Sequence, residues 1–158
     1  MAQKISPMLW FDGQAEEAAQ FYVSVFPNSE ILDVTHYGEG APRPAGMVMT
    51  VSFRLAGQEF TALNGGPEFK FNEAISFVID CASQAEVDAY WDKLTAGGGE
   101  PGPCGWLKDK YGLSWQVTPR RLMELMQDKD KAKANRVMQA MLQMGKIDVA
   151  ALERAAAG

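Results

Sequence analysis

The sequence has a single histidine and only two cysteines, so it is poor in the residues from which most protein metal sites are built. Cys81 and Cys104 fall outside any Cys-x-x-Cys or Cys/His spacing, so neither a zinc site nor a redox motif is indicated. We expect both to be buried free thiols. His36 has no His, Cys or carboxylate cluster near it, and we expect it at the surface or half-buried rather than in a catalytic role.

Long basic clusters and long apolar runs are also missing. The net charge is -5, and the sequence has no basic cluster of the kind that nucleic-acid binding requires. We therefore expect no nucleic-acid partner. No stretch of about 18 apolar residues is available for a membrane span, and no signal peptide opens the sequence. We therefore expect a soluble, cytoplasmic protein without a membrane partner.

The chain does have enough apolar material for a complete core. It has 158 residues, of which 47% are hydrophobic, and a chain of this length buries roughly 70% of its unfolded surface. This predicts one globular domain or two small fused modules that need no metal or disulfide to fold.

The two halves of the sequence show the same order of elements. Alternation, turn residues and helical spacing predict a strand, a helix and three strands in the first half, over 5–11, 14–26, 30–37, 47–55 and 59–63. In the second half a strand over 74–80 precedes a helix opened by the capping box Ser83 to Glu86, and a hairpin follows over 105–108 and 113–118. The glycines at 97–99 end a helix and are not a phosphate loop.

The halves can be aligned as copies of one βαβββ plan. Phe21-Tyr22 matches Tyr90-Trp91, which carries Pro7 onto Ser76, and the segment 57–61 matches 112–116. The sequence thus predicts an α+β fold with one module over residues 1–67, a second over 74–119 and a helical tail over 120–158, together forming one structural domain. In the tail, Thr118 is expected to cap a first helix, and longer and shorter helices to follow over 130–144 and from Asp148. Its five methionines are either adaptable core filler or a pliant cover for a ligand or partner.

Three segments carry a family resemblance: 11–22, 86–91 and, most specifically, the hairpin 104–119 with Trp115-Gln116-Val117. They resemble the glyoxalase, bleomycin-resistance and extradiol-dioxygenase superfamily, also called vicinal oxygen chelate proteins. Within it they look like the PhnB-like branch, often labelled 3-demethylubiquinone-9 3-methyltransferase. The resemblance covers nearly the whole chain, including the tail. It implies that the two modules curl their strands into one mixed sheet around a cleft.

The resemblance also implies where a metal would bind in metal-dependent members. Those four positions, on the first and fourth strand of each module, are Pro7, Thr61, Ser76 and Gln116 in this sequence. Only Gln116 is a plausible ligand, because proline has no donor atom and hydroxyls bind borderline metals poorly. We therefore predict no metal and no cofactor.

Strand alternation predicts which residues face the cleft. The predicted ligand-cleft residues are Leu9, Phe11, Thr61, Leu63, Ser76, Val78, Ser114 and Gln116. Their apolar wall with few polar anchors favours a metal-free protein that binds a small, partly aromatic molecule. The alternative is an enzyme of the PhnB-like family, either a glyoxalase-type lyase or the methyltransferase of the label, with acid or base chemistry from Tyr37, Glu59, Asp80 or Asp109. No glycine-rich strand-to-helix turn for an adenosylmethionine cofactor is present.

We also expect a homodimer. A curled sheet leaves strand edges to cover, and members of the superfamily commonly pair their subunits. Val137, Met138, Met141, Leu142 and Met144 make the tail apolar enough to join such an interface. The alternative is a monomer whose tail folds back over its own sheet.

Overall fold

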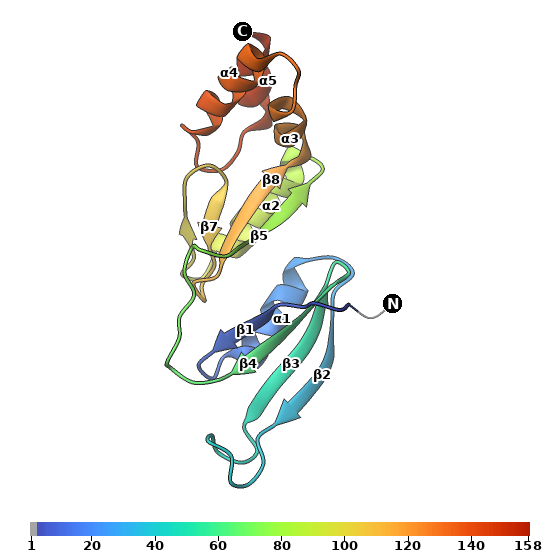
Figure 1. Ribbon diagram of the computed structural model, residues 1–158, viewed down its shortest axis with the longest axis vertical. Helices are drawn as coiled ribbons and strands as arrows, with labels where there is room; N and C mark the ends of the chain where they lie inside the picture. The colour runs from blue at the N-terminus through green and yellow to red at the C-terminus, as the bar shows by residue number, and fades with distance from the viewer. Residues whose placement is uncertain (1–2) are drawn as a thin grey trace. The chain divides into compact units, whose positions relative to one another are not determined.

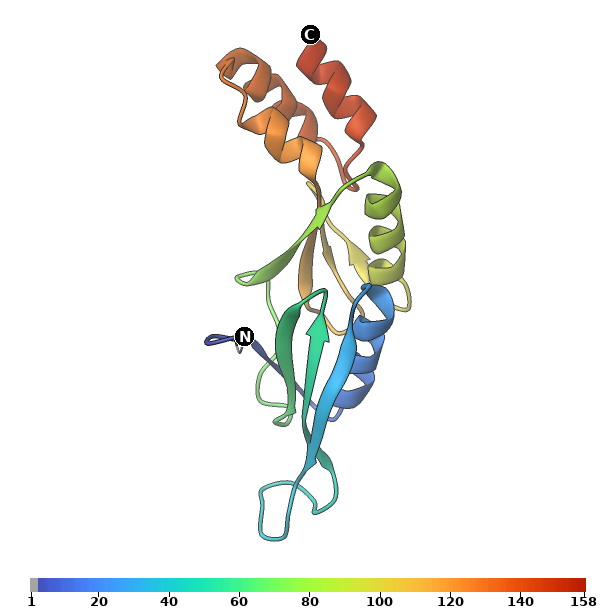
Figure 2. The same cartoon turned by 90° about the vertical axis from the view of Figure 1, so that its right-hand side faces the viewer.

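The computed structural model describes residues 3–158 and divides into two compact units, the first running to Phe71 and the second spanning Asn72–Gly158. Each unit contains a four-stranded mixed sheet. Figure 2 shows that one face of each sheet is covered by a helix of the same unit. The predicted α+β class and the repeated order of strand, helix and strands are confirmed, while the arrangement of the two modules as one domain remains a prediction.

The first unit is built around aromatic residues between its sheet and its helix. Its elements are β1 (Met8–Phe11), α1 (Ala15–Val25), β2 (Glu30–His36), β3 (Val48–Leu55) and β4 (Gln58–Asn64), in the sheet order β1-β4-β3-β2 (Figure 1). Only β1 and β4 run parallel. Tyr22 from α1 stacks on Phe53 of β3, and Phe53 stacks in turn on Phe60 of β4. Small alanines dominate the rest of the buried face of α1, which lets the helix lie close to the sheet.

The second unit repeats this plan with different core residues. Its sheet order is β5-β8-β7-β6, formed by β5 (Ser76–Cys81), β6 (Glu100–Pro101), β7 (Trp106–Lys108) and β8 (Ser114–Pro119), with α2 (Gln84–Thr95) against one face. Ser83 caps α2 as predicted, since its side chain accepts a hydrogen bond from the Glu86 amide. The sequence did not predict β6, because two residues that include a proline are too few to show alternation.

One buried carboxylate holds the β7–β8 hairpin together. Asp109, only 2% exposed, accepts hydrogen bonds from the Tyr111 and Leu113 amides on one oxygen and from Trp115 Nε1, at 2.9 Å, on the other. Gly112 follows at a φ of 87°, a conformation that favours glycine. The turn, the strand after it and the buried indole are therefore positioned by the same side chain.

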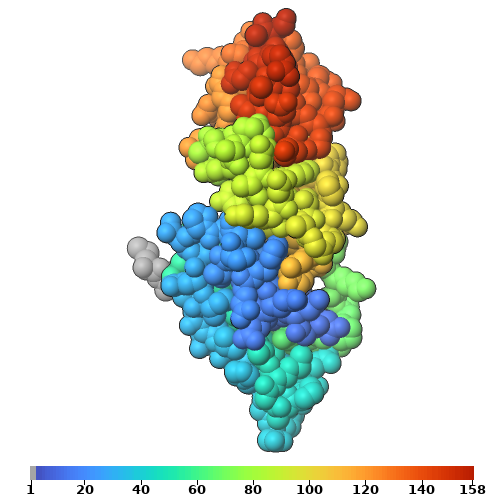
Figure 3. Space-filling model, turned by 180° about the vertical axis from the view of Figure 1, so that it is seen from behind, coloured from blue at the N-terminus to red at the C-terminus, as the bar shows by residue number. Residues whose placement is uncertain are grey.

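The tail is part of the second unit, where it packs on itself and against α2. It consists of α3 (Arg120–Met126), α4 (Lys131–Met141) and α5 (Val149–Ala157). In Figure 3 its orange and red atoms lie directly against the yellow-green atoms of α2. Its core is a cluster of Leu122, Leu125, Val137, Ile147, Leu152 and Ala156, with methionines packed around it.

Two predicted boundaries in the tail are wrong. The cap of α3 is Pro119 rather than Thr118, because β8 continues one residue further and its last residue leads directly into the helix. Asp130 caps α4 through bonds from the Ala132 and Lys133 amides, but the helix ends at Met141 and not at Met144. Residues 142–148 leave the helix and turn back toward the sheet of the second unit, as described below.

No helix in residues 3–158 is both long and apolar enough to cross a bilayer, and α2, with 12 residues, is far too short.

Replacing Trp115 by Ala should cost about 3–5 kcal/mol of unfolding free energy, because it removes a buried indole and also leaves the Asp109 carboxylate without its Nε1 donor. Gln116→Ala, on the opposite face of the same strand, should cost about 1 kcal/mol or less, since it loses one half-exposed hydrogen bond to Ser76. Urea unfolding of both variants measures the difference. A larger loss for Gln116→Ala would show that the face assignment of β8 is wrong.

Candidate functional site

The second sheet has one face buried under α2 and one face open. Trp115 and Val117 point into the core, so Ser114, Gln116 and Thr118 lie on the other face. The antiparallel pairing of Lys108 with Ser114 and of Trp106 with Gln116 places these two β7 residues on the same open face. Across β8, Ser76 and Val78 of β5 complete the row. Polar and aromatic side chains thus share one surface that no helix of this unit covers.

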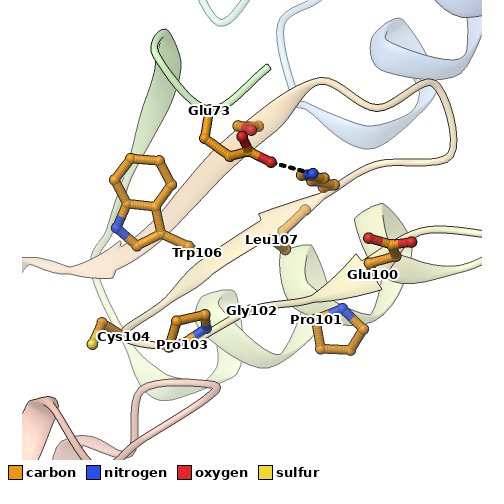
Figure 4. Close-up of a pocket in the computed structure, with 10 residues that line it drawn as sticks. Glu73, Glu100, Pro101, Gly102, Pro103, Cys104, Trp106 and Leu107 are labelled. Carbon is orange, nitrogen blue, oxygen red and sulfur yellow. Dashed lines mark ion pairs between the residues drawn. The ribbon is translucent and has the colours of Figure 1, made fainter. Parts of the chain in front are cut away.

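A cavity of about 420 Å³ lies on this surface, within the range of about 300–1,000 Å³ typical of ligand pockets. It is lined by Glu73, Glu100, Pro101, Gly102, Pro103, Cys104, Trp106, Leu107, Lys108 and Ser114. Figure 4 shows the Trp106 ring and the Glu73 side chain on one side of the strands, while Pro101, Gly102, Pro103 and Cys104 follow one another along an edge. The cavity therefore has an aromatic wall, a wall of proline and glycine, and a few polar groups.

An ion pair bridges the cavity rim. Lys108 of β7 and Glu73, from the segment before β5, are in direct contact, drawn as the dashed line in Figure 4. Their hydrogen bond is the main cause that lowers the pKa of Glu73 and raises the pKa of Lys108, so both stay charged at neutral pH. Glu100 pairs opposite Lys108 in the sheet. Two carboxylates and one ammonium give the rim a net negative charge.

Ser114 lines the cavity and carries a polar group without a hydrogen-bond partner among the described residues. It is 1% exposed, and its Oγ has no hydrogen-bond partner among the described residues. A buried hydroxyl in this state costs about 1–3 kcal/mol. A ligand oxygen or nitrogen at this position would recover that energy, because a hydroxyl can both donate and accept.

The structure brings half of the predicted ligand-cleft residues together. Ser76, Val78, Ser114 and Gln116 share the open face of the second sheet, where Gln116 Nε2 donates to Ser76 Oγ at 3.0 Å. Ser114 alone among them lines the cavity. Thr61 and Leu63 lie half-buried on the open face of the first sheet, in the other compact unit.

The structure contradicts the prediction that Leu9 and Phe11 face the cleft. They are 6% and 3% exposed and lie on the helix-facing side of the first sheet, with Leu9 beside buried Ala62. The open face of β1 instead presents Met8 and Trp10. Since β1 pairs with β4 in register, the residue opposite Thr61 is Met8.

The cause is a difference of one residue between the two copies of the repeat. Asp12, Gly13 and Gln14 connect β1 to α1, whereas only Ala82 and Ser83 connect β5 to α2. An alignment of the two copies that is anchored on the helices is therefore shifted by one residue in the first strand. A shift of one residue assigns each side chain of that strand to the wrong face of the sheet. With the sheets aligned instead, Met8 is equivalent to Val78, because each lies opposite the matched pair Thr61 and Gln116.

The positions that the resemblance gives to a metal thus become Met8, Thr61, Val78 and Gln116 rather than Pro7, Thr61, Ser76 and Gln116. A thioether, a hydroxyl, an alkyl group and an amide do not form a ligand set for zinc, iron or manganese. Across residues 3–158 no three His, Cys, Asp or Glu side chains gather closely enough to hold an ion. His36 is exposed at the end of β2.

The four residues considered for acid or base chemistry all have structural partners. Asp109 holds the hairpin, and Asp80 forms an exposed ion pair with Arg120. Glu59 pairs with Arg54, and Tyr37 donates its hydroxyl proton to the Asn64 carbonyl at 2.6 Å. None of the four lines the cavity.

The two cysteine thiols differ in their burial. Cys81 is fully buried, and burial, with smaller contributions from Glu86 and Asp80, raises its pKa to about 12. Such a thiol stays protonated and unreactive at neutral pH. Cys104 is half-buried and lines the cavity, so the prediction of two buried thiols holds for Cys81 only.

Sequence reasoning missed most of the cavity. Trp106 and Lys108 had a readable signal, since antiparallel pairing across the predicted hairpin puts them on the face of Ser114 and Gln116. Glu73 had none, because it lies in an irregular connection whose path only the folded chain defines. The 102–105 loop was equally hidden, since its proline and glycine residues predict a turn but not what the turn borders.

Comparisons with known proteins agree with this fold. The family model for 3-demethylubiquinone-9 3-methyltransferase matches residues 3–118, so the match ends before the tail, which the sequence resemblance had included. Comparison with curated protein sequences found no match.

Among solved structures, a putative 3-demethylubiquinone-9 3-methyltransferase, PhnB protein, from Bacillus cereus is 38% identical, with a TM-score of 0.66 over 74% of this chain and 99% of its own. A Pseudomonas aeruginosa protein is 20% identical, with a TM-score of 0.60 over 75% of this chain and 98% of its own. The fosfomycin resistance protein FosX from Listeria monocytogenes is 16% identical, with a TM-score of 0.51 over 75% and 93%. The last two show a shared fold alone. By its sequence match and its repeated βαβββ sheets, the chain belongs to the PhnB-like family described as 3-demethylubiquinone-9 3-methyltransferase, within the vicinal oxygen chelate superfamily.

Proposed function

We propose that this protein is a cytoplasmic, metal-free small-molecule-binding protein whose cavity on the second sheet takes a small, partly aromatic ligand. The observation that carries the proposal is the buried Ser114 hydroxyl, which has no partner among the described residues and lines a cavity walled by Trp106. A buried polar group without a hydrogen-bond partner is a cost to folding that a bound ligand would offset.

The lining indicates the kind of ligand. Trp106 offers an aromatic face, and the prolines at 101 and 103 add flat apolar surface, so a ring fits better than a flexible chain. The hydroxyl of Ser114 selects for one oxygen or nitrogen on that ring. Because Glu73 and Glu100 outnumber Lys108 at the rim, an anionic ligand is repelled and a neutral or cationic one is favoured.

The family description favours a second candidate, an enzyme that transfers a methyl group. It would need a base beside the acceptor oxygen, and the carboxylates that line the cavity are those of Glu73 and Glu100. The ion pair with Lys108 lowers the pKa of Glu73 and weakens it as a base. Binding without chemistry is therefore the better supported function, and incubating the protein with S-adenosylmethionine and catechol, followed by mass spectrometry, separates the two.

Benzyl alcohol is a suitable probe, because it joins one ring to one neutral hydroxyl. We expect saturation-transfer NMR to detect it bound to the full-length protein, with cyclohexylmethanol weaker through loss of aromatic stacking and benzoate weaker through charge repulsion. Native mass spectrometry and elemental analysis of the purified protein complete the test. A stoichiometric metal, or equal binding of all three probes, would contradict the proposal.

Ser114→Ala should have opposite effects on folding and on binding. The variant removes an unpartnered buried hydroxyl, so the ligand-free protein should be unchanged or more stable by about 1 kcal/mol. Its affinity for benzyl alcohol should fall by about fivefold to tenfold, since one hydrogen bond to the ligand is lost.

Thr95→Val is the matched control for that variant. It also deletes a hydroxyl in the second unit, but this hydroxyl bonds to the Trp91 carbonyl and does not line the cavity. Its affinity for the probe should equal that of the wild type. If Ser114→Ala destabilises the protein and binds the probe normally, the hydroxyl has a structural role and the cavity assignment fails.

We further propose that the protein is a homodimer. Met123, Met138 and Leu142 on the tail are each between 39% and 50% exposed, whereas Val137 is buried and belongs to the tail core. Sedimentation equilibrium at micromolar concentration should give twice the 17.3 kDa chain mass. The double variant Met138→Glu, Leu142→Glu should shift the mass toward the monomer, because two charges then replace apolar contact surface. Wild-type protein sedimenting at 17.3 kDa would refute the dimer.

A further inference from the structure

The segment Met144, Gly145, Lys146 and Ile147, which we call the strap, joins α4 to α5 and runs along the cavity loop 102–105. The Cys104 amide donates to the Met144 carbonyl and the Gly105 amide to the Gly145 carbonyl, both at 2.8 Å. The other two amides of this region, those of Gly102 and Trp106, bond within the loop itself. The tail thus satisfies two adjacent backbone donors of the loop that carries Gly102, Pro103 and Cys104 into the cavity wall.

The far end of the strap is fixed to α2. Gln84 Nε2 donates to the Ile147 carbonyl at 2.9 Å, and its Oε1 accepts from the Val149 amide at 2.8 Å. Lys146 forms an ion pair with Asp88 one turn further along the helix. Ile147 itself is 1% exposed and belongs to the tail core. The strap is therefore bonded to the loop on one side and to α2 on the other, which restricts movement of the loop.

The loop adopts a backbone that depends on such support. Cys104 has a φ of 58°, which is uncommon for a residue with a side chain, and Gly105 follows at 84°. A Cβ on Gly105 would lie 3.0 Å from the Val117 carbonyl oxygen and 3.1 Å from Ile147 Cγ1. The loop is thus packed tightly between β8 and the strap, with room only for glycine.

The strap also lies outside the part of the chain that the family shares. The family match ends at residue 118. The Bacillus cereus protein is covered over 99% of its length by only 74% of this chain. The cavity wall is therefore held by a segment beyond the family match, while Trp106, Lys108 and Ser114 lie within it.

We propose that the strap is a positioning element for the ligand site: it holds the 102–105 loop as the cavity wall and so adapts the family's module to a ligand of this chain's own. The part that concerns ligand affinity rests on the proposed function, and the part that concerns the loop does not. None of the strap residues lines the cavity, so their effect on the ligand passes through the loop.

Two readouts on full-length protein test the proposal separately. The first is the rate at which Ellman's reagent labels Cys104, a direct measure of how firmly the wall is held, since Cys81 is buried and unreactive in the folded state. The second is the dissociation constant for benzyl alcohol. Ile147→Ala should speed labelling by about tenfold and weaken the probe by about fivefold, because the loop loses the side chain that packs against Gly105.

Leu152→Ala is the matched control. Leu152 is as deeply buried in the same tail core, but it lies on α5, and the atoms nearest to a Cβ placed on Gly105 belong to Val117 and Ile147. It should lower the melting temperature to a similar extent and leave both readouts at wild-type values. Gln84→Met is a milder second variant. It removes the two hydrogen bonds of Gln84 to Ile147 and Val149 without opening a core cavity, and it should shift both readouts in the direction of Ile147→Ala.

Equal labelling rates in Ile147→Ala, Gln84→Met and wild type would overturn the proposal, as would equal acceleration in Leu152→Ala, which would show a general loosening of the tail. If the wild type does not bind benzyl alcohol, the proposed function fails, and the labelling rates still decide whether the strap holds the loop.

Discussion

A buried carboxylate is the constraint on which the second unit depends. Asp109 accepts three hydrogen bonds from the hairpin, two from amides in its own turn and one from the Trp115 indole. Burying a carboxyl group is costly, and the cost is offset here because both of its oxygens accept hydrogen bonds from the hairpin. The turn is thereby locked, Trp115 is locked into the core, and the alternate residues of β8 must face the other way.

The candidate site follows from that choice of face. With Trp115 turned inward, Ser114 and Gln116 turn outward, and the paired strand adds Trp106 and Lys108 to the same surface. The strands present apolar side chains such as Leu107, Trp115 and Val117 to the core, whereas the open face combines an aromatic ring, an ion pair and a buried hydroxyl without a partner among the described residues. Such local departures from good bonding are expected where a protein binds something rather than where it only folds.

The two units share one plan, and the second differs from the first in the segments around the open face of its sheet. The βαβββ plan is common to both units and to relatives with little sequence identity, and it supplies a sheet with one free face. What distinguishes the second unit is added around that face: Glu73 from the incoming connection, the 102–105 loop and the tail segment behind it. These parts are irregular in backbone, and they supply or support one side of the cavity wall, as loops on a rigid scaffold commonly do.

Much of this fold could be predicted from the sequence because its elements are specified locally. The spacing of Val87, Trp91 and Leu94 determines the buried side of α2, and the Ser83 to Glu86 capping box its start. The Asp109 to Gly112 turn specifies the hairpin, and alternation assigns Trp115 and Gln116 to opposite faces of β8.

Only the tertiary structure decided the features that depend on pairing between distant segments. The face of β1 is set by its register with β4, and one extra residue before α1 was enough to reverse the positions of Leu9 and Phe11 relative to the aligned repeat. Glu73 meets Lys108, and Met144 meets Cys104, through contacts between segments whose own sequences carry no periodic signal. Local sequence specifies helices, turns and alternation because these arise from neighbouring residues. A cavity wall built from a connection, strands and a loop, with a tail segment behind it, exists only once the chain has brought these parts together.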